Sequence, residues 1–229
     1  MRFRQESGGA SLQFEEEYFS DRGYTQREHL VKRHVFEVIK WAAKISESDL
    51  FSGRGKKALD VGCACGYASE VLEALGYETY GVDVSRWGIM QAKTNSEGHF
   101  LVCDAQAKLP FKDETFDLIT CYDVLEHLRL PEKTIQSMLD VCDGVMVCTT
   151  PNKTVEKPVR KIMRDFDETH INVKSPSEWE NCISKNLEYK LLKIGTFLDL
   201  TAKPTNNRLF FKSLNLPNWG LTVRILVRK

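Results

Sequence analysis

Short apolar runs alternate with helical patterns along most of this chain from Lys57 onward. Between the runs, apolar residues recur three and four positions apart, which is the period of a helix with one buried face. Strands that alternate with crossover helices pair in parallel and form an α/β sheet. The predicted strands are KALDVG, which begins at Lys57, and the segments 77–82, 100–103, 116–122, 144–149, 187–200 and 221–227.

Helical segments fill the intervals between these strands. The predicted helices are 28–45, one with Ala68, Val71, Leu72 and Leu75 on its apolar face, 87–96, one that begins at Pro131, one that carries Val159, Ile162, Met163 and Phe166, and one that follows the capping box SPSE at 175–178. We therefore expect an α/β fold, a Rossmann-like doubly wound, seven-stranded, mostly parallel sheet with helices on both faces. We expect a single domain, 1–229, with an N-terminal helical cap at 1–50 and the core at 51–229.

The composition fits an ordinary globular protein. Of 229 residues, 28% are charged and 42% are hydrophobic, and 32 basic residues balance 32 acidic ones. The whole-chain charge thus gives no reason to expect wholesale binding to nucleic acid or membrane, although the middle of the chain is acidic and the last third is basic. No apolar run approaches the roughly 18 residues of a membrane helix, and the N-terminus lacks the apolar stretch of a secretory signal. Seven cysteines, several in apolar runs, favour a reduced, cytoplasmic protein.

The most informative local pattern is a glycine turn after the first strand. In ALDVGCACGYASEVL the strand leads to Gly62, and Gly66 begins a helix, so backbone N–H groups can approach a ligand. Asp83 ends the next strand, where a carboxylate can accept hydrogen bonds from ribose hydroxyls. A dinucleotide turn would need Gly where Tyr67 stands, because the last Gly allows close packing of helix on strand. The spacing therefore disfavours NAD.

These motifs resemble those of class I S-adenosylmethionine-dependent methyltransferases. The resemblance covers residues 58–152 and rests on DVGCACG with GVDVS, on CDAQAKLPFKDETFDLITCYDVLEHL and on CTTPN. It implies S-adenosylmethionine as the cofactor. The implied cofactor-binding residues are Asp60 and Gly62 near the methionine portion, Ala64 and Gly66 in the turn, Asp83 at the ribose, Asp104 and Ala105 at the adenine, and Tyr122 near the sulfonium.

Candidate catalytic residues follow the fourth predicted strand. His127 lies directly after that strand, and His170 lies in a later loop that can fold over the same end of the sheet. With Tyr122 they are the predicted catalytic residues, because an imidazole can accept a proton from a hydroxyl near neutral pH. His29, His34 and His99 are instead expected to be solvated or satisfied in the core.

A metal site is an alternative interpretation of the same region. Asp123, Glu126, His127 and His170 supply two carboxylates and two imidazoles, which suit a divalent cation. The arrangement is similar to that in metal-assisted O-methyltransferases of quinone biosynthesis and of small-RNA ribose. Since the RNA group usually has Glu where Asp123 stands, a divalent metal is possible here but is not expected.

The expected reaction is methyl transfer to a small-molecule acceptor, at oxygen. Lys153, Lys157, Arg160, Lys161 and Arg164 follow the TPN motif and offer a positive rim for an anionic acceptor. Alternatives are an RNA ribose 2′-O-methyltransferase, a carboxyl or nitrogen methyltransferase, and a non-catalytic S-adenosylmethionine-binding protein. We expect no membrane partner, and nucleic acid is disfavoured but not excluded. Tyr18, Phe19, Arg22 and Tyr24 are candidates for a lid over the cofactor.

Overall fold

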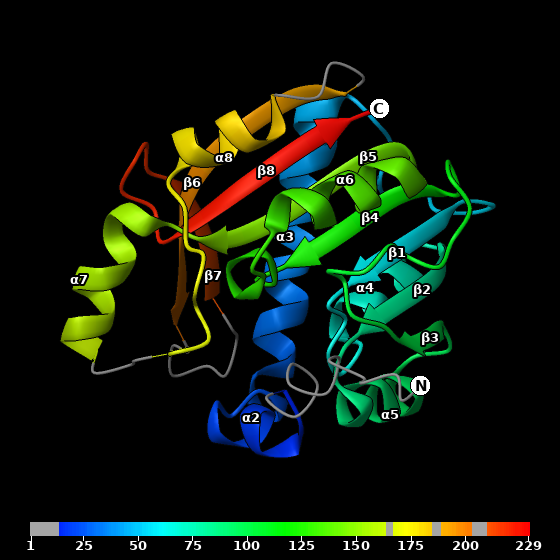
Figure 1. Cartoon of the computed structure of the whole chain (residues 1–229), viewed down its shortest axis with the longest axis horizontal. Coiled ribbons are helices and arrows are strands. Elements are labelled where there is room, and N and C mark those ends of the chain that lie inside the picture. Colours follow the sequence, from blue (N-terminus) through cyan, green and yellow to red (C-terminus); the bar gives the residue numbers. More distant parts are fainter. Residues whose placement is uncertain (1–13, 164–166, 185–188, 203–209) are drawn as a thin grey trace, which may run out of the picture.

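The computed structural model describes residues 14–163, 167–184, 189–202 and 210–229. Figure 1 shows these residues as a central twisted sheet flanked by helices. The elements in chain order are α2 (Glu16–Asp21), η1 (Thr25–Arg27), α3 (Glu28–Ser46), β1 (Lys57–Val61), α4 (Tyr67–Ala74), β2 (Glu78–Asp83), α5 (Arg86–Asn95), β3 (His99–Val102), β4 (Phe116–Tyr122), η2 (Leu125–His127), α6 (Pro131–Val141), β5 (Cys142–Pro151), α7 (Lys153–Met163), α8 (Pro176–Ile183), β6 (Lys190–Ala202), β7 (Phe210–Asn215) and β8 (Thr222–Arg228).

The sheet has the strand order β3-β2-β1-β4-β5-β8-β6-β7. The strands β3, β2, β1, β4 and β5 are parallel, and β8, β6 and β7 join them through antiparallel pairs. The predicted Rossmann-like α/β fold is confirmed.

The predicted number of seven strands is wrong, because the described residues already form a sheet of eight. The additional strand is β7, whose sequence FFKSLN lacks an alternation of apolar and polar residues. It pairs with β6 at the edge of the sheet, with Leu198 opposite Leu214. Backbone pairing with β6 defines this strand, and a hydrophobic pattern could not reveal it.

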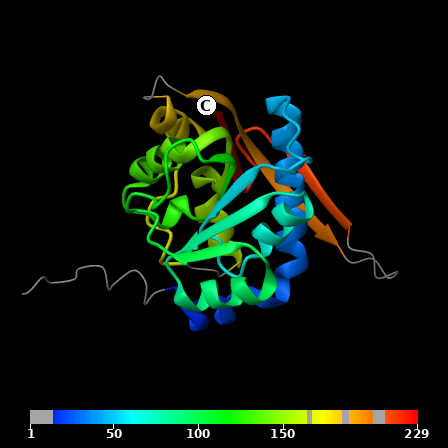
Figure 2. The same cartoon turned by 90° about the vertical axis from the view of Figure 1, so that its right-hand side faces the viewer.

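Helices cover both faces of the sheet, as Figure 2 shows with α3 and α4 on one side and α6 and α8 on the other. On the first side, α3 and α4 pack against the sheet in one hydrophobic cluster that includes Val38, Ile39, Leu72, Leu118 and Val147. On the second side, α6 and α8 pack in a cluster that includes Leu59, Ile119, Met138, Met146 and Trp179. Because side chains of a strand alternate between faces, Leu118 and Ile119 serve the two clusters in turn.

The predicted capping box at the start of α8 is present. The Glu178 backbone N–H donates to Ser175 Oγ at 3.3 Å, and the Ser175 N–H donates to Glu178 Oε2 at 2.7 Å. The predicted helix with Val159 corresponds to α7, but its last predicted apolar residue, Phe166, lies outside the described residues. No helix in the described part of the chain is long and apolar enough to cross a bilayer.

Strand order places a ligand crevice between β1 and β4. The chain winds outward from β1 in both directions, so the connections after β1 and β4 diverge and leave space at the carboxyl ends of the strands. Gly62 stands at that point with φ +77°, and a Cβ there would clash with the side chain of Val124 after β4. Only glycine lets the two connections approach so closely.

Met138 tests the packing of helices on the second face of the sheet. Met138 on α6 is fully buried, whereas Met90 on α5 is 67% exposed. Met138→Ala should lower the free energy of unfolding by about 2–5 kcal/mol, because it leaves a cavity in a packed core. Met90→Ala is the matched control and should change it by less than about 0.5 kcal/mol. Urea unfolding measures both, and equal stability of the two variants would contradict the assignment of Met138 to the core.

Candidate functional site

A pocket of about 1100 Å³ lies at the carboxyl ends of β1, β2 and β4. One wall is the glycine turn with the ends of β2 and β3, and a second is the turn η2 with the loop that carries His170. The N-terminal segment around α2, the first turns of α3, and residues of β6, β7 and the start of β8 complete it. The volume suits a nucleoside cofactor together with a second small molecule.

Six of the eight predicted cofactor-binding residues line this pocket: Gly62, Ala64, Asp83, Asp104, Ala105 and Tyr122. Asp60 and Gly66 do not. Gly66 precedes α4 with φ +81°, and a Cβ there would lie 3.0 Å from the Cα and Cβ of Ala92 on α5. The structure therefore gives Gly66 a packing role between α4 and α5 and places it outside the ligand cavity.

The Asp83 carboxylate is fixed by two backbone donors. The Ala64 N–H donates to Oδ2 and the Ser85 N–H to Oδ1, each at 2.8 Å. Ala64 adopts φ +46°, a conformation that favours glycine, so the turn holds a strained residue to make this bond. Burial raises the pKa of Asp83 even though both backbone N–H groups oppose the shift. Each oxygen retains a lone pair for a further donor, which fits the predicted contact with ribose hydroxyls.

Asp60 lies buried in β1, outside the pocket lining. Its carboxylate accepts hydrogen bonds from Thr120 Oγ1 at 3.0 Å and from Ser69 Oγ at 3.2 Å. Burial raises the pKa of Asp60 to about 7, against the effect of those two donors. These contacts tie β1 to β4 and α4.

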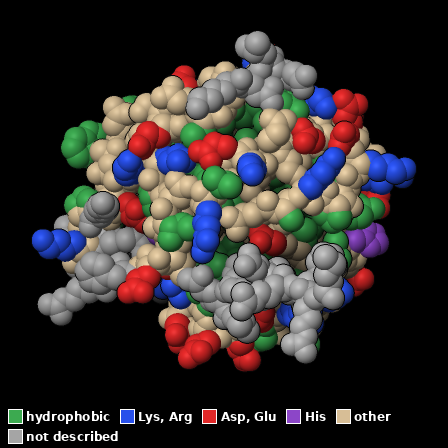
Figure 3. Space-filling model, in the orientation of Figure 1, with side chains coloured by type: hydrophobic (Ala, Val, Ile, Leu, Met, Phe, Trp, Pro, Cys, Tyr) green, Lys and Arg blue, Asp and Glu red, His purple; other side chains and the backbone are tan. Residues whose placement is uncertain are grey.

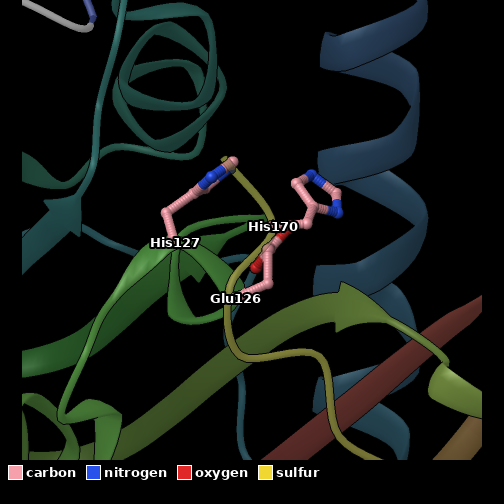
Figure 4. Close-up of side chains that lie close together, drawn as sticks. All are labelled: Glu126, His127 and His170. Carbon is pink, nitrogen blue, oxygen red and sulfur yellow. The ribbon is translucent and has the colours of Figure 1, made fainter. Parts of the chain in front are cut away.

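Three of the four candidate metal ligands gather on the opposite wall. Glu126 and His127 come from η2 and His170 from the loop before α8, and each offers a ligand atom within 4.8 Å of the other two. Figure 4 shows the three side chains grouped near the end of β4. The fourth candidate, Asp123, is outside this group, and its Oδ1 accepts a hydrogen bond from Thr149 Oγ1 at 3.0 Å.

Glu126 is a fully buried carboxyl group with an incomplete set of partners. Oε2 accepts a hydrogen bond from Thr150 Oγ1 at 3.2 Å, while Oε1 is buried without a hydrogen-bond partner. Burial, followed by the nearby charge of Asp123, raises the pKa of Glu126 well above its usual range. A buried carboxylate needs a proton or a cation, and Oε1 is free for either.

The two imidazoles are held differently. His127 Nδ1–H donates to the Thr169 carbonyl at 3.1 Å, which leaves the lone pair on Nε2. Burial, together with the nearby His170, lowers the pKa of His127 to about 4, so its ring is neutral at physiological pH. His170 Nδ1 lies 2.7 Å from Glu156 Oε1, and its Nε2 lies 3.6 Å from Asp167 Oδ2. The cluster therefore consists of one carboxyl group and two imidazoles, and the acids Glu156 and Asp167 lie next to His170.

The four predicted lid residues, Tyr18, Phe19, Arg22 and Tyr24, all line the pocket. Arg22 pairs with Asp167 at 2.9 Å and lies over the ring of Tyr18, and Phe19 stacks on Trp87. Glu15 accepts hydrogen bonds from the N–H groups of Arg86 and Trp87 at the start of α5. The segment thus bridges the cofactor wall and the loop that carries His170.

Asp167 fastens that loop to the N-terminal segment. Although burial acts in the other direction, hydrogen bonds from Thr169 and Arg22 lower the pKa of Asp167 to about 2. Sequence reasoning missed Asp167, Thr169 and Glu15, since nothing in a loop sequence indicates a partner so far along the chain.

His34 and Asp199 are further pocket residues that the sequence did not single out. His34 on α3 was expected to be solvated or satisfied in the core, but only one of its nitrogens has a partner: Nδ1 lies 2.7 Å from Asp199 Oδ2, while Nε2 is buried without a hydrogen-bond partner. The available signal for Asp199 was a lone acid within an apolar strand, FLDL.

The structure describes the side chains of two of the five residues predicted to form a positive rim. Lys153 pairs with Glu178 at 2.6 Å, and Lys161 is exposed on α7. The side chains of Lys157 and Arg160 and the whole of Arg164 lie outside the described residues.

The parallel sheet, the glycine turn and the acid that ends β2 define a nucleotide-binding α/β protein. A family model described as a methyltransferase domain matches residues 31–193, which is more than half of the chain. The chain therefore belongs to this family of class I S-adenosylmethionine-dependent methyltransferases, and S-adenosylmethionine is its cofactor.

Curated relatives match part of the chain in sequence. The ubiquinone biosynthesis O-methyltransferase of Glaesserella parasuis is 34% identical over 113 residues, which are 44% of this chain and 48% of that protein. The chain spans about half the length of the curated relatives it matches.

Solved structures extend the likeness over almost the whole chain. Magnesium protoporphyrin IX methyltransferase from Synechocystis with bound SAH has a TM-score of 0.63 at 18% identity and covers 93% of this chain and 97% of its own. A possible histamine N-methyltransferase from Thermotoga maritima has a TM-score of 0.65 at 16% identity, covering 90% and 95%. At such identities the match shows the shared fold.

The role of Asp83 is open to a direct test. Asp83→Asn should weaken binding of S-adenosylhomocysteine about 10- to 100-fold, because it removes the charge that strengthens hydrogen bonds from the ribose. Titration calorimetry measures the affinity, and thermal unfolding verifies that the variant is folded. Asp113→Asn, at an exposed acid, is the control. Unchanged affinity in a folded Asp83→Asn variant would contradict the ribose contact.

Asp60 makes stability depend on pH. Its pKa is about 7 in the folded protein and about 3.9 in an unfolded chain. Between these values the folded state retains a proton that the unfolded state releases, so this carboxyl lowers the free energy of unfolding as pH rises from about 4 to 7. Asp60→Asn lacks the effect and should gain stability relative to the native protein between pH 5 and 8. Urea unfolding across that range tests this, and parallel curves for the two proteins would refute it.

Proposed function

We propose that this chain transfers the methyl group of S-adenosylmethionine to an oxygen atom of a small-molecule acceptor. The observation that carries the proposal is a single pocket with a nucleoside cradle on one wall and a buried carboxyl group with two imidazoles on the other. The named relative acts in O-methylation, which supports oxygen as the atom that is methylated.

Most of the acceleration would come from position. Methyl transfer is an in-line displacement, so holding the acceptor oxygen, the methyl carbon and the sulfur in line removes much of the entropic barrier. Asp83, Asp104 and the glycine turn would fix the cofactor. The segment around α2 would exclude water, because Tyr18 and Phe19 cover the pocket and Arg22 fastens the segment to Asp167.

Glu126, His127 and His170 would hold a divalent cation. The residues fit such an ion, since Glu126 Oε1 is buried without a partner and His127 presents the lone pair of Nε2. One carboxylate and two imidazoles are a common mixed donor set for first-row metals. A bound cation would supply positive charge that lowers the energy of a nearby acceptor oxygen. His127 and His170 would then serve the reaction by holding this ion.

A small acceptor suits the described surface better than RNA. Lys153 and Lys174 are paired with Glu178 and Glu132, which leaves less positive charge on this part of the surface for phosphates. On the face drawn in Figure 3, acidic and basic side chains are interspersed. RNA binding would instead need a basic surface whose affinity falls steeply with salt.

The test is a panel of small hydroxyl, carboxyl and amine compounds and short RNAs, incubated with methyl-labelled cofactor. We expect a labelled small molecule with the label on oxygen. Labelled RNA or a labelled amine would overturn the acceptor class, and cofactor binding without any transfer would indicate a non-catalytic binding protein.

The cation is tested on the same reaction. Chelation should lower the rate at least about tenfold, Mg²⁺ or Mn²⁺ should restore it, and Glu126→Gln should give the chelated rate with or without added metal. Glu97→Gln, at an exposed acid, is the control. A rate that chelation leaves unchanged would remove the cation from the proposal.

A further inference from the structure

A second polar cluster lies in the same pocket as the three candidate metal ligands. It joins four elements: His34 on α3, Asp199 on β6, Arg224 on β8 and Tyr122 at the end of β4. His34, Asp199 and Tyr122 line the pocket, and Arg224 lies behind Asp199 with 1% of its surface exposed.

Arg224 holds the carboxylate of Asp199 in place. Its Nη2 donates to Asp199 Oδ1 at 2.9 Å and to Oδ2 at 3.2 Å, and its guanidinium lies over the ring of Phe197 at 4.0 Å. Although burial opposes the shift, hydrogen bonds and charge from His34, Ser213 and Arg224 lower the pKa of Asp199 to about 2. Asp199 is therefore a carboxylate at any physiological pH and can only accept.

Asp199 in turn sets the state of His34. Because the carboxylate cannot donate, the 2.7 Å contact requires the proton on His34 Nδ1. In the neutral ring the lone pair is then on Nε2, which is buried and without a hydrogen-bond partner. An acid that orients an imidazole in this way is the arrangement by which proteins make a histidine accept a proton.

The Tyr122 hydroxyl is a hydrogen-bond donor that complements the acceptor at His34 Nε2. The ring centroid of Tyr122 is 6.3 Å from that of His34, and its hydroxyl is also buried without a hydrogen-bond partner. Burial raises the pKa of Tyr122 well above its usual range, so the phenol keeps its proton and can donate. Two buried unpaired groups side by side are costly and call for a ligand.

We propose that His34 and Tyr122 bind the acceptor through its hydroxyl group, with His34 as the proton acceptor. A hydroxyl both donates and accepts, so one such group can donate to His34 Nε2 and accept from the Tyr122 hydroxyl. The surrounding lining of Leu30, Val31, Pro151, Phe211 and Leu221 is apolar, which favours an alcohol or phenol on an apolar body. This inference rests on the proposed methyl transfer to oxygen.

The bonds made and broken in the proposed methyl transfer involve only the acceptor, the cofactor and His34. The acceptor oxygen forms a bond to the methyl carbon, the carbon–sulfur bond breaks, and its electron pair goes to the sulfonium sulfur, which becomes neutral. The hydroxyl proton moves to His34 Nε2, and Asp199 stabilises the resulting imidazolium at Nδ1. The products are a methyl ether, S-adenosylhomocysteine and a proton on His34 that later leaves to solvent.

Phenol and anisole are matched probes of this site, because anisole has the same ring without the hydroxyl proton. In the full chain with ¹⁵N-labelled histidine and saturating S-adenosylhomocysteine, phenol should shift the unprotonated nitrogen of His34, and anisole should not. Phenol should also bind about tenfold more tightly than anisole. Equal binding of the two probes, with no shift at His34, would overturn the inference.

Two histidines on α3 provide matched variants. His34→Phe keeps a ring but loses both nitrogens, so it should lose the preference for phenol and lower kcat for a hydroxyl acceptor about 10²- to 10⁴-fold. His29→Phe, at an exposed position, should keep both. Both variants should bind S-adenosylhomocysteine like the native protein. Retained kcat in His34→Phe would refute the inference alone, whereas native protein that fails to bind S-adenosylhomocysteine would refute the proposed function itself.

Discussion

The hydrogen bond from the Ala64 N–H to the Asp83 carboxylate joins the turn after β1 to the end of β2, and the cofactor wall depends on it. The parallel register that sets Val61 beside Val82 brings these residues together. The Gly62 N–H, 2.7 Å from the Val82 carbonyl, adds a second tie between the same segments. Since the turn also needs positive φ at Gly62 and Ala64, the sequence can form it only with residues that tolerate that backbone.

The sequence predicts this half of the molecule well because its signals are local. Strand β4 begins and ends where the apolar run does, at Phe116 and Tyr122, and six of the eight predicted cofactor-binding residues line the pocket. Asp60 and Gly66 show the limit of such reasoning. A motif tells which residues recur near a ligand, but whether a side chain faces the ligand or the core depends on the neighbouring strands and helices. Asp60 faces Thr120 and Ser69, and Gly66 faces Ala92.

On the other wall the sequence predicted Glu126, His127 and His170, but it could not predict the contacts between distant segments that complete that wall. His34 and Asp199 are 165 residues apart, and Arg22 and Asp167 are 145 apart. Neither pair has a spacing that suggests a site. The edge strand β7 was missed for a related reason, since β6 determines its pairing and its own sequence has no alternation. Charge patterns did not help, because a lone His on a helix is usually solvated or satisfied in a core.

Acidic side chains from the middle of the chain line the cofactor wall of the pocket. Asp83 ends β2 and Asp104 lies in the loop after β3, whereas Asp60 is buried in β1 outside the pocket lining. The resemblance assigns Asp83 to the ribose and Asp104 to the adenine amino group, and both of these groups can donate hydrogen bonds, so carboxylates at the two positions suit the nucleoside end of S-adenosylmethionine. With the nucleoside held there, the methyl group would be directed toward Tyr122 and the opposite wall, where the acceptor of the proposed reaction would bind.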